Sequence, residues 1–210
     1  MLKLYTFHVS SASFRVRCAL ALKNIPYEAV QISLAGQHKS AEYLAVNPEG
    51  RVPALDTGHG ILTQSLAILD WLEETHPTPS LYPVEAMDRA RCRAFAHIIA
   101  SDIFPLQNMG TRQKLGAEFG ADEARQAQWA ADWIAKGFAS LEIETATRGW
   151  QPGTFLFGDT PTLADICLVP QMNNARRYKV DLTPFPLLNA ADAKARAHPA
   201  FEVAALSPQD

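Results

Sequence analysis

The first fifty residues alternate between strand-like and helix-like hydrophobic patterns. Apolar and polar side chains alternate over residues 2–7, which predicts a strand, and residues 27–33 are predicted to form a second strand. Between them, residues 14–23 form an apolar run rich in Ala and Leu, which predicts a helix. Residues 40–46 predict a second, shorter helix that leads into a turn.

A turn and a hairpin follow in the next stretch. Residues 47–50 read Asn-Pro-Glu-Gly, which favours a turn because Pro fixes φ and Gly tolerates positive φ. Residues 54–56 and 61–63 predict two short strands joined as a hairpin. Gln64 and Ser65 then open a helix whose leucines recur at helical spacing. The predicted order, strand-helix-strand-helix-strand-strand-helix, is that of a thioredoxin-like fold.

The rest of the chain has a helical pattern throughout. Residues 76–83 carry three prolines and predict a linker between domains. Helices are expected over 88–115 with a kink or break at Pro105, over 122–147, after the Thr-x-x-Asp sequence of residues 162–165, and over 188–205. We therefore expect an α/β thioredoxin-like domain over residues 1–78 and an all-α domain over residues 84–210.

Composition excludes several classes of function. Hydrophobic residues make up 48% and charged residues 20%, as in soluble globular proteins. A net charge of −3 without a basic block argues against nucleic acid as a partner, and no apolar run reaches the ~18 residues of a membrane span. The N-terminus lacks a secretory apolar region. Three distant cysteines fit a reducing cytoplasm, and six scattered histidines do not indicate a metal site.

The beginning of the first helix is where thioredoxin-like folds carry their reactive group. Here the chain reads Val9-Ser10-Ser11-Ala12-Ser13, without the cysteine that a dithiol oxidoreductase requires. A serine hydroxyl can instead donate a hydrogen bond to a bound thiolate, helped by the helix N-terminus. That would lower the ligand thiol's pKa below its free value of ~8.5. The alternative is that Ser10 or Ser13 only caps the helix.

Two further features suit one peptide-like ligand that carries a carboxylate. Pro53 has no N–H to donate, so regular strand pairing is interrupted at Val52 and its backbone is left for an extended peptide. Gln64 and Ser65 supply an amide and a hydroxyl at a helix N-terminus, which favours a carboxylate. Taken singly, each feature is more commonly an ordinary turn or cap.

This succession of turn, Val-Pro, hairpin and Gln-Ser helix resembles the glutathione-binding half of the glutathione transferases. Residues 10–17, Ser-Ser-Ala-Ser-Phe-Arg-Val-Arg, are similar to the Ser-Ser-Cys-x-x-Arg-Val-Arg signature of the zeta class, the family of maleylacetoacetate and maleylpyruvate isomerases. Nearly the whole chain takes part in the resemblance, because four more stretches agree: residues 64–68, 105–108, 158–165 and 175–184.

The resemblance implies glutathione as cofactor, a homodimer, and a role for each matching residue. Ser10 faces the glutathione sulfur with Ser11 beside it, and Arg177 meets a substrate carboxylate. The residues implied to hold glutathione are His38 at the glycine carboxylate, Val52 with a cis Pro53 at the cysteinyl backbone, Gln64 and Ser65 at the γ-glutamyl end, and Gln107 from the helical domain.

Two positions depart from the family pattern. Val9 stands where the family often has Arg, and Ala12 stands where it usually has Cys. An isomerase acting on a dicarboxylate needs cations, so the first departure bears on the substrate. The leading prediction is a glutathione-dependent cis–trans isomerase of maleyl-type keto acids. A glutathione-conjugating transferase of small electrophiles and a non-catalytic interaction module with the same fold remain alternatives.

Overall fold

The structure, a computed structural model, describes residues 1–205, and their contacts divide the chain into two compact units. Unit 1 comprises Met1–Leu81 together with the segment from Ala197, and unit 2 comprises Tyr82–Arg196. The boundary near Leu81 falls inside the predicted linker. The helical domain was expected to run to residue 210, whereas residues 197–205 pack with unit 1; the last five residues of that prediction lie outside the described chain.

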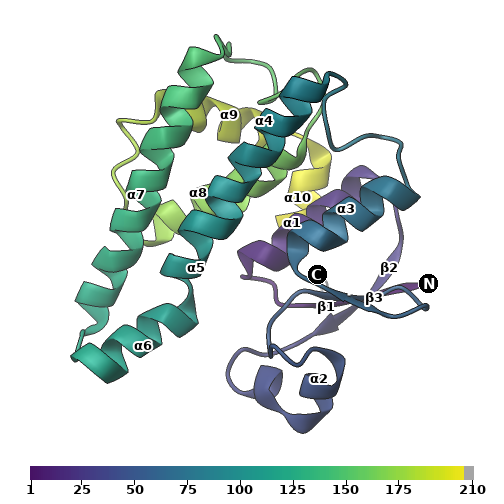
Figure 1. Ribbon diagram of the computed structural model, residues 1–210, viewed down its shortest axis with the longest axis vertical. Helices are drawn as coiled ribbons and strands as arrows, with labels where there is room; N and C mark the ends of the chain where they lie inside the picture. Colours follow the sequence, from purple (N-terminus) through teal and green to yellow (C-terminus); the bar gives the residue numbers. More distant parts are fainter. Residues whose placement is uncertain (206–210) are drawn as a thin grey trace. The chain divides into compact units, whose positions relative to one another are not determined.

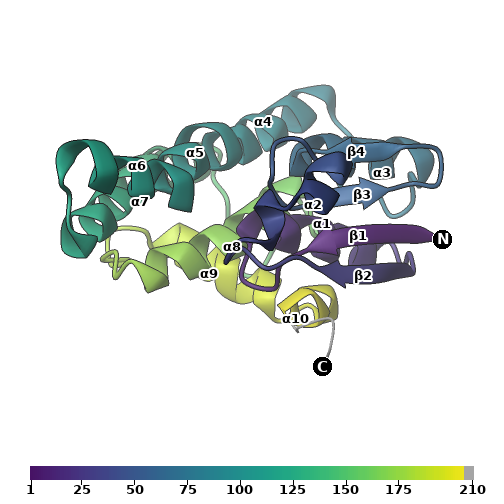
Figure 2. The ribbon, with the colours of Figure 1, turned by 90° about the horizontal axis from the view of Figure 1, so that it is seen from below.

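Unit 1 is built on a four-stranded sheet in the order β2-β1-β3-β4 (Figure 2). β1 pairs parallel with β2 and antiparallel with β3, which pairs antiparallel with β4. The predicted order of elements is confirmed, with one additional 3₁₀ turn, η1. The bounds are β1 Leu2–Thr6, α1 Ser11–Leu22, β2 Tyr27–Gln31, η1 Gln37–Lys39, α2 Ala41–Val46, β3 Ala54–Asp56, β4 Ile61–Thr63, α3 Ser65–Thr75 and, beyond unit 2, α10 Pro199–Ala205.

Helices cover both faces of this sheet. α1 and α3 lie on one face and α2 on the other (Figure 1). On β1, Leu4 and Thr6 are fully buried, whereas Tyr5 packs into the cluster that contains Tyr43 of α2. This alternation is the side-chain period of a strand covered on both faces. α10 packs against α1, so the C-terminal helix completes the core of unit 1.

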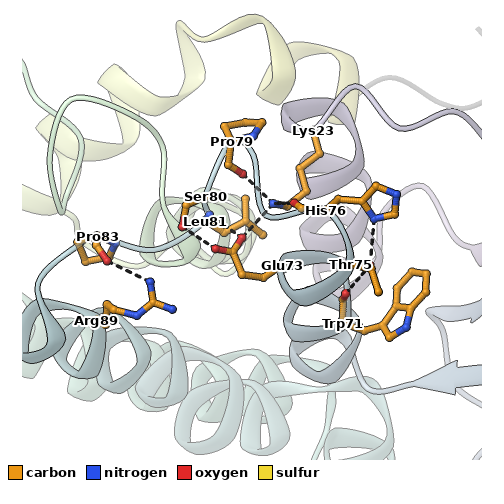
Figure 3. Close-up of polar contacts among 10 residues, drawn as sticks. All are labelled: Lys23, Trp71, Glu73, Thr75, His76, Pro79, Ser80, Leu81, Pro83 and Arg89. Carbon is orange, nitrogen blue, oxygen red and sulfur yellow. Dashed lines mark hydrogen bonds and ion pairs between the residues drawn. The ribbon is translucent and has the colours of Figure 1, made fainter.

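A buried lysine fastens the end of α1 to α3 and to the proline-rich segment (Figure 3). The Lys23 ammonium donates to the Glu73 carboxylate at 2.9 Å and to two backbone carbonyl oxygens of residues 76–79. Burial raises the pKa of Glu73, but hydrogen bonds from the Ser80 hydroxyl, the Leu81 amide and Lys23 together bring that pKa below its usual value. The first part of the predicted linker is therefore an ordered part of unit 1.

The regular secondary structure of unit 2 is helical, apart from one isolated β-bridge between Phe155 and Gly158. The expected helix over 88–115 continues through Pro105, which lies near the start of α5, and is interrupted at Asn108, whose backbone is extended; the expected helix over 188–205 is divided before Pro199. None of the helices in residues 1–205 is long and apolar enough to cross a membrane. The bounds are α4 Ala86–His97, a π-helical segment η2 Ile98–Ile103, α5 Phe104–Gln107, α6 Met109–Phe119, α7 Glu123–Thr147, α8 Leu163–Arg177 and α9 Pro186–Arg196.

The start of α8 is fixed by a fully buried carboxylate, Asp165. It accepts hydrogen bonds from the amide and hydroxyl of Thr162, each at 2.8 Å, and from the amide of Leu156 at 3.0 Å. Burial raises the pKa of Asp165, and these hydrogen bonds act in the opposite direction. The Thr-x-x-Asp sequence is thus a helix start, as the sequence predicts.

Candidate active site

The register of the sheet brings three predicted site segments to one edge. Tyr5 near the end of β1 pairs with Ala54 at the start of β3, and Ala54 pairs with Thr63 at the end of β4. Consequently the loop after β1, the residues just before β3 and those just after β4 all leave the sheet on the same side. These segments contain Ser10, Val52–Pro53 and Gln64–Ser65.

Ser10 is the N-cap of α1. Its Oγ accepts a hydrogen bond from the Ser13 amide at 3.2 Å, and its own amide donates to the Phe7 carbonyl at 3.0 Å. Because accepting that bond uses a lone pair of the hydroxyl, the Ser10 O–H proton can still be donated to another group. Capping and thiolate binding, which the sequence left as alternatives, are therefore compatible in one side chain. Ser11, the first residue of α1, is buried.

The segment before β3 is held extended by side chains of α2 and the following turn. The Arg51 carbonyl accepts from the Tyr43 hydroxyl at 2.6 Å and from the Asn47 amide group at 2.7 Å. The Val52–Pro53 peptide bond is cis, as the resemblance implied. Within the described part of the chain, the Val52 amide and carbonyl have no hydrogen-bond partner. A main-chain donor and acceptor are thus available to an extended peptide.

His38 approaches the same turn from η1. Its Nδ1 lies 3.4 Å from the Ser33 carbonyl oxygen, an arrangement that suits a proton on Nδ1. With Nδ1 protonated, Nε2 donates to a carboxylate only when the ring is the imidazolium. The His38 carbonyl also explains Gly50, because a Cβ there would lie 2.9 Å from that oxygen and the Gly50 φ is +59°.

Gln64 and Ser65 form the N-terminus of α3. Gln64 has a φ of 67°, which is unusual for a residue with a side chain. Its side-chain nitrogen Nε2 donates to both carboxylate oxygens of Glu49, at 3.0 and 2.9 Å. The buried Ser65 hydroxyl accepts a hydrogen bond from Arg15 at 3.2 Å. Since a guanidinium can only donate, the Ser65 proton is left for an acceptor such as a carboxylate. Sequence reasoning missed Arg15, although a charged residue within an apolar helix was a visible signal.

The two predicted site residues of unit 2 have different surroundings. Gln107, at the end of α5, is buried and exchanges two side-chain hydrogen bonds with Gln171 of α8, at 2.8 and 2.9 Å. Arg177, the last residue of α8, is exposed, and its guanidinium has no hydrogen-bond or ion-pair partner within residues 1–205. Its neighbour Arg176 pairs with the buried carboxylate of Asp192. The two neighbouring arginines therefore have different contacts, and that only one of them faces a substrate pocket stays a prediction.

Unit 2 also contains a cavity of about 710 Å³ that includes none of the predicted residues. Two arginines and two carboxylates line it, so its charges largely cancel, and Arg148 stacks on the ring of Phe157 at 3.9 Å. The hydroxyl of Thr147 in its lining already donates its proton to the Ile143 carbonyl at 2.7 Å, so it is not available to a thiolate. The candidate active site remains the sheet edge of unit 1 with Ser10.

Comparison with known proteins identifies the family. Residues 4–80 match the family model described as Glutathione S-transferase, N-terminal domain. Maleylpyruvate isomerase of Ralstonia sp is 47% identical over 209 residues, which cover 99% of this chain and 98% of that protein. The holo structure of a maleylpyruvate isomerase, a bacterial zeta-class glutathione S-transferase, superposes with a TM-score of 0.93 at 46% identity, covering 98% and 99% of the two chains. The chain belongs to the zeta-class glutathione transferases.

A second zeta-type structure shows what such a site holds in a relative. Maleylacetoacetate isomerase of Anaeromyxobacter dehalogenans 2CP-1, 38% identical with a TM-score of 0.85, contains bound dicarboxyethyl glutathione and citrate in its active site. The match covers 97% of this chain and 94% of that one. The fold expected from the sequence, a thioredoxin-like domain followed by helices, is therefore confirmed both by the architecture and by these relatives.

Proposed function

We propose that this zeta-class transferase is a glutathione-dependent cis–trans isomerase of maleyl-type keto acids, maleylpyruvate or maleylacetoacetate. The observation that carries the proposal is the meeting, at one sheet edge, of the Ser10 hydroxyl, the unpaired Val52 backbone and the Ser65 hydroxyl. These are the groups required by a peptide that bears both a thiol and a carboxylate. The sequences and bound ligands of the relatives support the same function.

Glutathione would be held through its backbone and both of its ends. Val52 offers an antiparallel amide and carbonyl to the cysteinyl residue. Ser65, whose lone pair is occupied by Arg15, donates its proton to the γ-glutamyl carboxylate at the N-terminus of α3. Gln64 helps to bind the γ-glutamyl end, and His38 binds the glycine carboxylate. The family resemblance adds Gln107 to this proposal; its side-chain amide has an N–H that Gln171 does not use.

Ser10 would then hold the sulfur as a thiolate. Its hydroxyl proton and the N-terminus of α1 both favour a negative charge at that position. The thiolate adds to one carbon of the cis double bond, and the electron pair moves to the conjugated carbonyl as an enolate. Rotation about the new single bond and elimination of the thiolate give the trans product and return glutathione unchanged. The protein supplies the thiolate and its placement against the alkene.

The substrate's acid group would be met by Arg177. Its planar guanidinium, which has no ion-pair partner within residues 1–205, suits a carboxylate, whereas the guanidinium of Arg176 is paired with Asp192. Ser11 would lie beside the sulfur, and the apolar Val9 leaves fewer cations near it than the family pattern provides. That departure keeps conjugation of small electrophiles as a second candidate, in which the adduct is released without elimination. We further propose that the enzyme works as a homodimer in the cytoplasm.

Turnover of maleylpyruvate and of maleylacetoacetate, with and without glutathione, tests the proposal. We expect loss of the cis substrate to require glutathione, and the amount of glutathione to stay constant over many turnovers. Stoichiometric consumption of glutathione with accumulation of an adduct would assign conjugation instead. Failure of the folded protein to bind to a glutathione column would assign the non-catalytic alternative.

A further inference from the structure

One buried cation near Ser10 has no part in the site described above. Arg17, on α1, is 2% exposed. Its guanidinium donates to the Thr6 hydroxyl at 2.9 Å, the Phe7 carbonyl at 3.3 Å, the His8 carbonyl at 2.9 Å and, through Nε, to a fourth oxygen. Within residues 1–205 no carboxylate lies at ion-pairing distance, so this buried charge is balanced by neutral oxygen atoms. Such an arrangement is costly compared with an apolar side chain of similar size.

The oxygen atoms that Arg17 binds belong to the loop between β1 and Ser10. Phe7 and His8 follow β1 directly, and the Phe7 carbonyl also accepts the hydrogen bond of the Ser10 amide at 3.0 Å. Arg17 and the Ser10 amide therefore share one acceptor. Any shift of the guanidinium moves the carbonyl that fixes the turn, and with it the position of the N-cap.

The fourth oxygen connects this loop to the end of the described chain. Arg17 Nε donates to the carbonyl of Ala204 in α10 at 3.0 Å. α10 packs against α1 and belongs to unit 1, although all of unit 2 separates the two helices in sequence (Figure 1). One side chain thus joins the strand end, the Ser10 loop and the C-terminal helix.

We propose that Arg17 is a positioning residue for the thiolate: it holds the loop before Ser10, and secures it to α10, so that the Ser10 hydroxyl faces the glutathione sulfur. This inference rests on the proposed function. The role depends on geometry as well as charge, because a guanidinium offers five donors in a fixed plane, whereas a lysine ammonium is a single point charge. Arg17 itself does not touch the sulfur in this role.

Three substitutions test the role, and a fourth provides a matched control. Arg17→Met removes every donor while keeping an unbranched side chain, and Arg17→Lys keeps the charge without the planar set of donors. Thr6→Val removes one acceptor of the guanidinium with little change of shape. Lys23→Met removes another buried cation, the C-cap residue of α1, whose contacts are with Glu73 and residues 76–79.

The decisive measurement is the pKa of the bound glutathione thiol, followed by ultraviolet absorbance of the thiolate, together with kcat and the glutathione KM. In both Arg17 variants we expect the thiol pKa to rise by about one unit, which is a tenfold loss of thiolate below that pKa. We expect kcat to fall in proportion while the glutathione KM changes less than threefold. Thr6→Val should shift the pKa in the same direction by less, and Lys23→Met should lower the unfolding midpoint and leave the pKa unchanged.

The proposal would be overturned by a folded Arg17→Met variant with the wild-type thiol pKa and kcat, since Arg17 would then be a structural anchor alone. Full rescue by Arg17→Lys would also overturn it, because charge rather than placement would be responsible. If Arg17→Met does not fold, the proposal would be overturned by a Thr6→Val variant whose thiol pKa equals that of the wild type. Absence of glutathione binding by the wild-type protein would instead contradict the proposed function.

Discussion

Replacing Ser10 with alanine removes two hydrogen bonds that different measurements can separate. The first is the cap, in which Oγ accepts from the Ser13 amide at 3.2 Å. Loss of such a cap costs about 1 kcal/mol of folding free energy. The second is the bond that the hydroxyl donates to the bound thiolate, and a hydrogen bond to a charged group contributes about 1.5–3 kcal/mol.

The second loss translates directly into a change of thiol pKa. At about 1.4 kcal/mol for each pKa unit, removal of the donated bond should raise the pKa of bound glutathione by about 1–2 units. Turnover measured below that pKa should fall by about 10- to 100-fold. Ultraviolet titration of the complex gives the pKa, and urea unfolding of the free protein gives the cost of the cap independently.

Two variants control for the loss of a hydroxyl from this segment. Ser13 is fully buried and accepts from the Phe7 amide at 3.4 Å, so Ser13→Ala should destabilise the protein and raise the thiol pKa by less than Ser10→Ala does. Ser10→Thr keeps a hydroxyl and should keep most of the activity. A Ser10→Ala protein that loses stability but retains the wild-type thiol pKa would refute the reasoning, and the role would pass to Ser11 or to backbone N–H groups.

Three further substitutions probe the carboxylate sites and the scaffold. Ser65→Ala should weaken glutathione binding by about 1–3 kcal/mol in calorimetry; unchanged affinity would reduce Ser65 to a helix cap. Asp165→Ala leaves the buried amides of Leu156 and Thr162 without an acceptor. Because each unsatisfied amide costs about 1–3 kcal/mol, chemical denaturation should show that the free energy of unfolding falls by roughly 2–6 kcal/mol. A variant with full stability and no turnover would make Asp165 a site residue. Arg177→Lys should lower kcat/KM for acidic substrates without changing glutathione affinity, whereas Arg176→Lys should not, and an equal loss with a neutral chloronitrobenzene would contradict the carboxylate role.

The properties of neighbouring residues were sufficient to predict most of the secondary structure of unit 1. Steric rules place the turn at residues 47–50, and period-2 and helical patterns give the order of strands and helices. Bounds were less well determined. α1 begins at Ser11 rather than near residue 14, because Ser10 caps it, a feature that hydrophobic periodicity does not report. The expected helix over 188–205 divides because Pro199 cannot continue a helix that precedes it.

The sequence also predicted a peptide-binding segment and a serine for the ligand's sulfur, since turn, cap and Val-Pro chemistry are properties of neighbouring residues. It could not supply the partners that orient them. Arg15 meets Ser65 across fifty positions, and Gln107 meets Gln171 across sixty-four. Arg17 donates to the carbonyl of Ala204, a hydrogen bond that connects α10 to the rest of unit 1. These contacts form because the sheet register and the helix packing bring together residues that are far apart in the sequence. No local pattern of residues specifies such pairings. The residue types of the candidate site were therefore predictable from the sequence, whereas the hydrogen bonds that hold these residues in place required the tertiary structure.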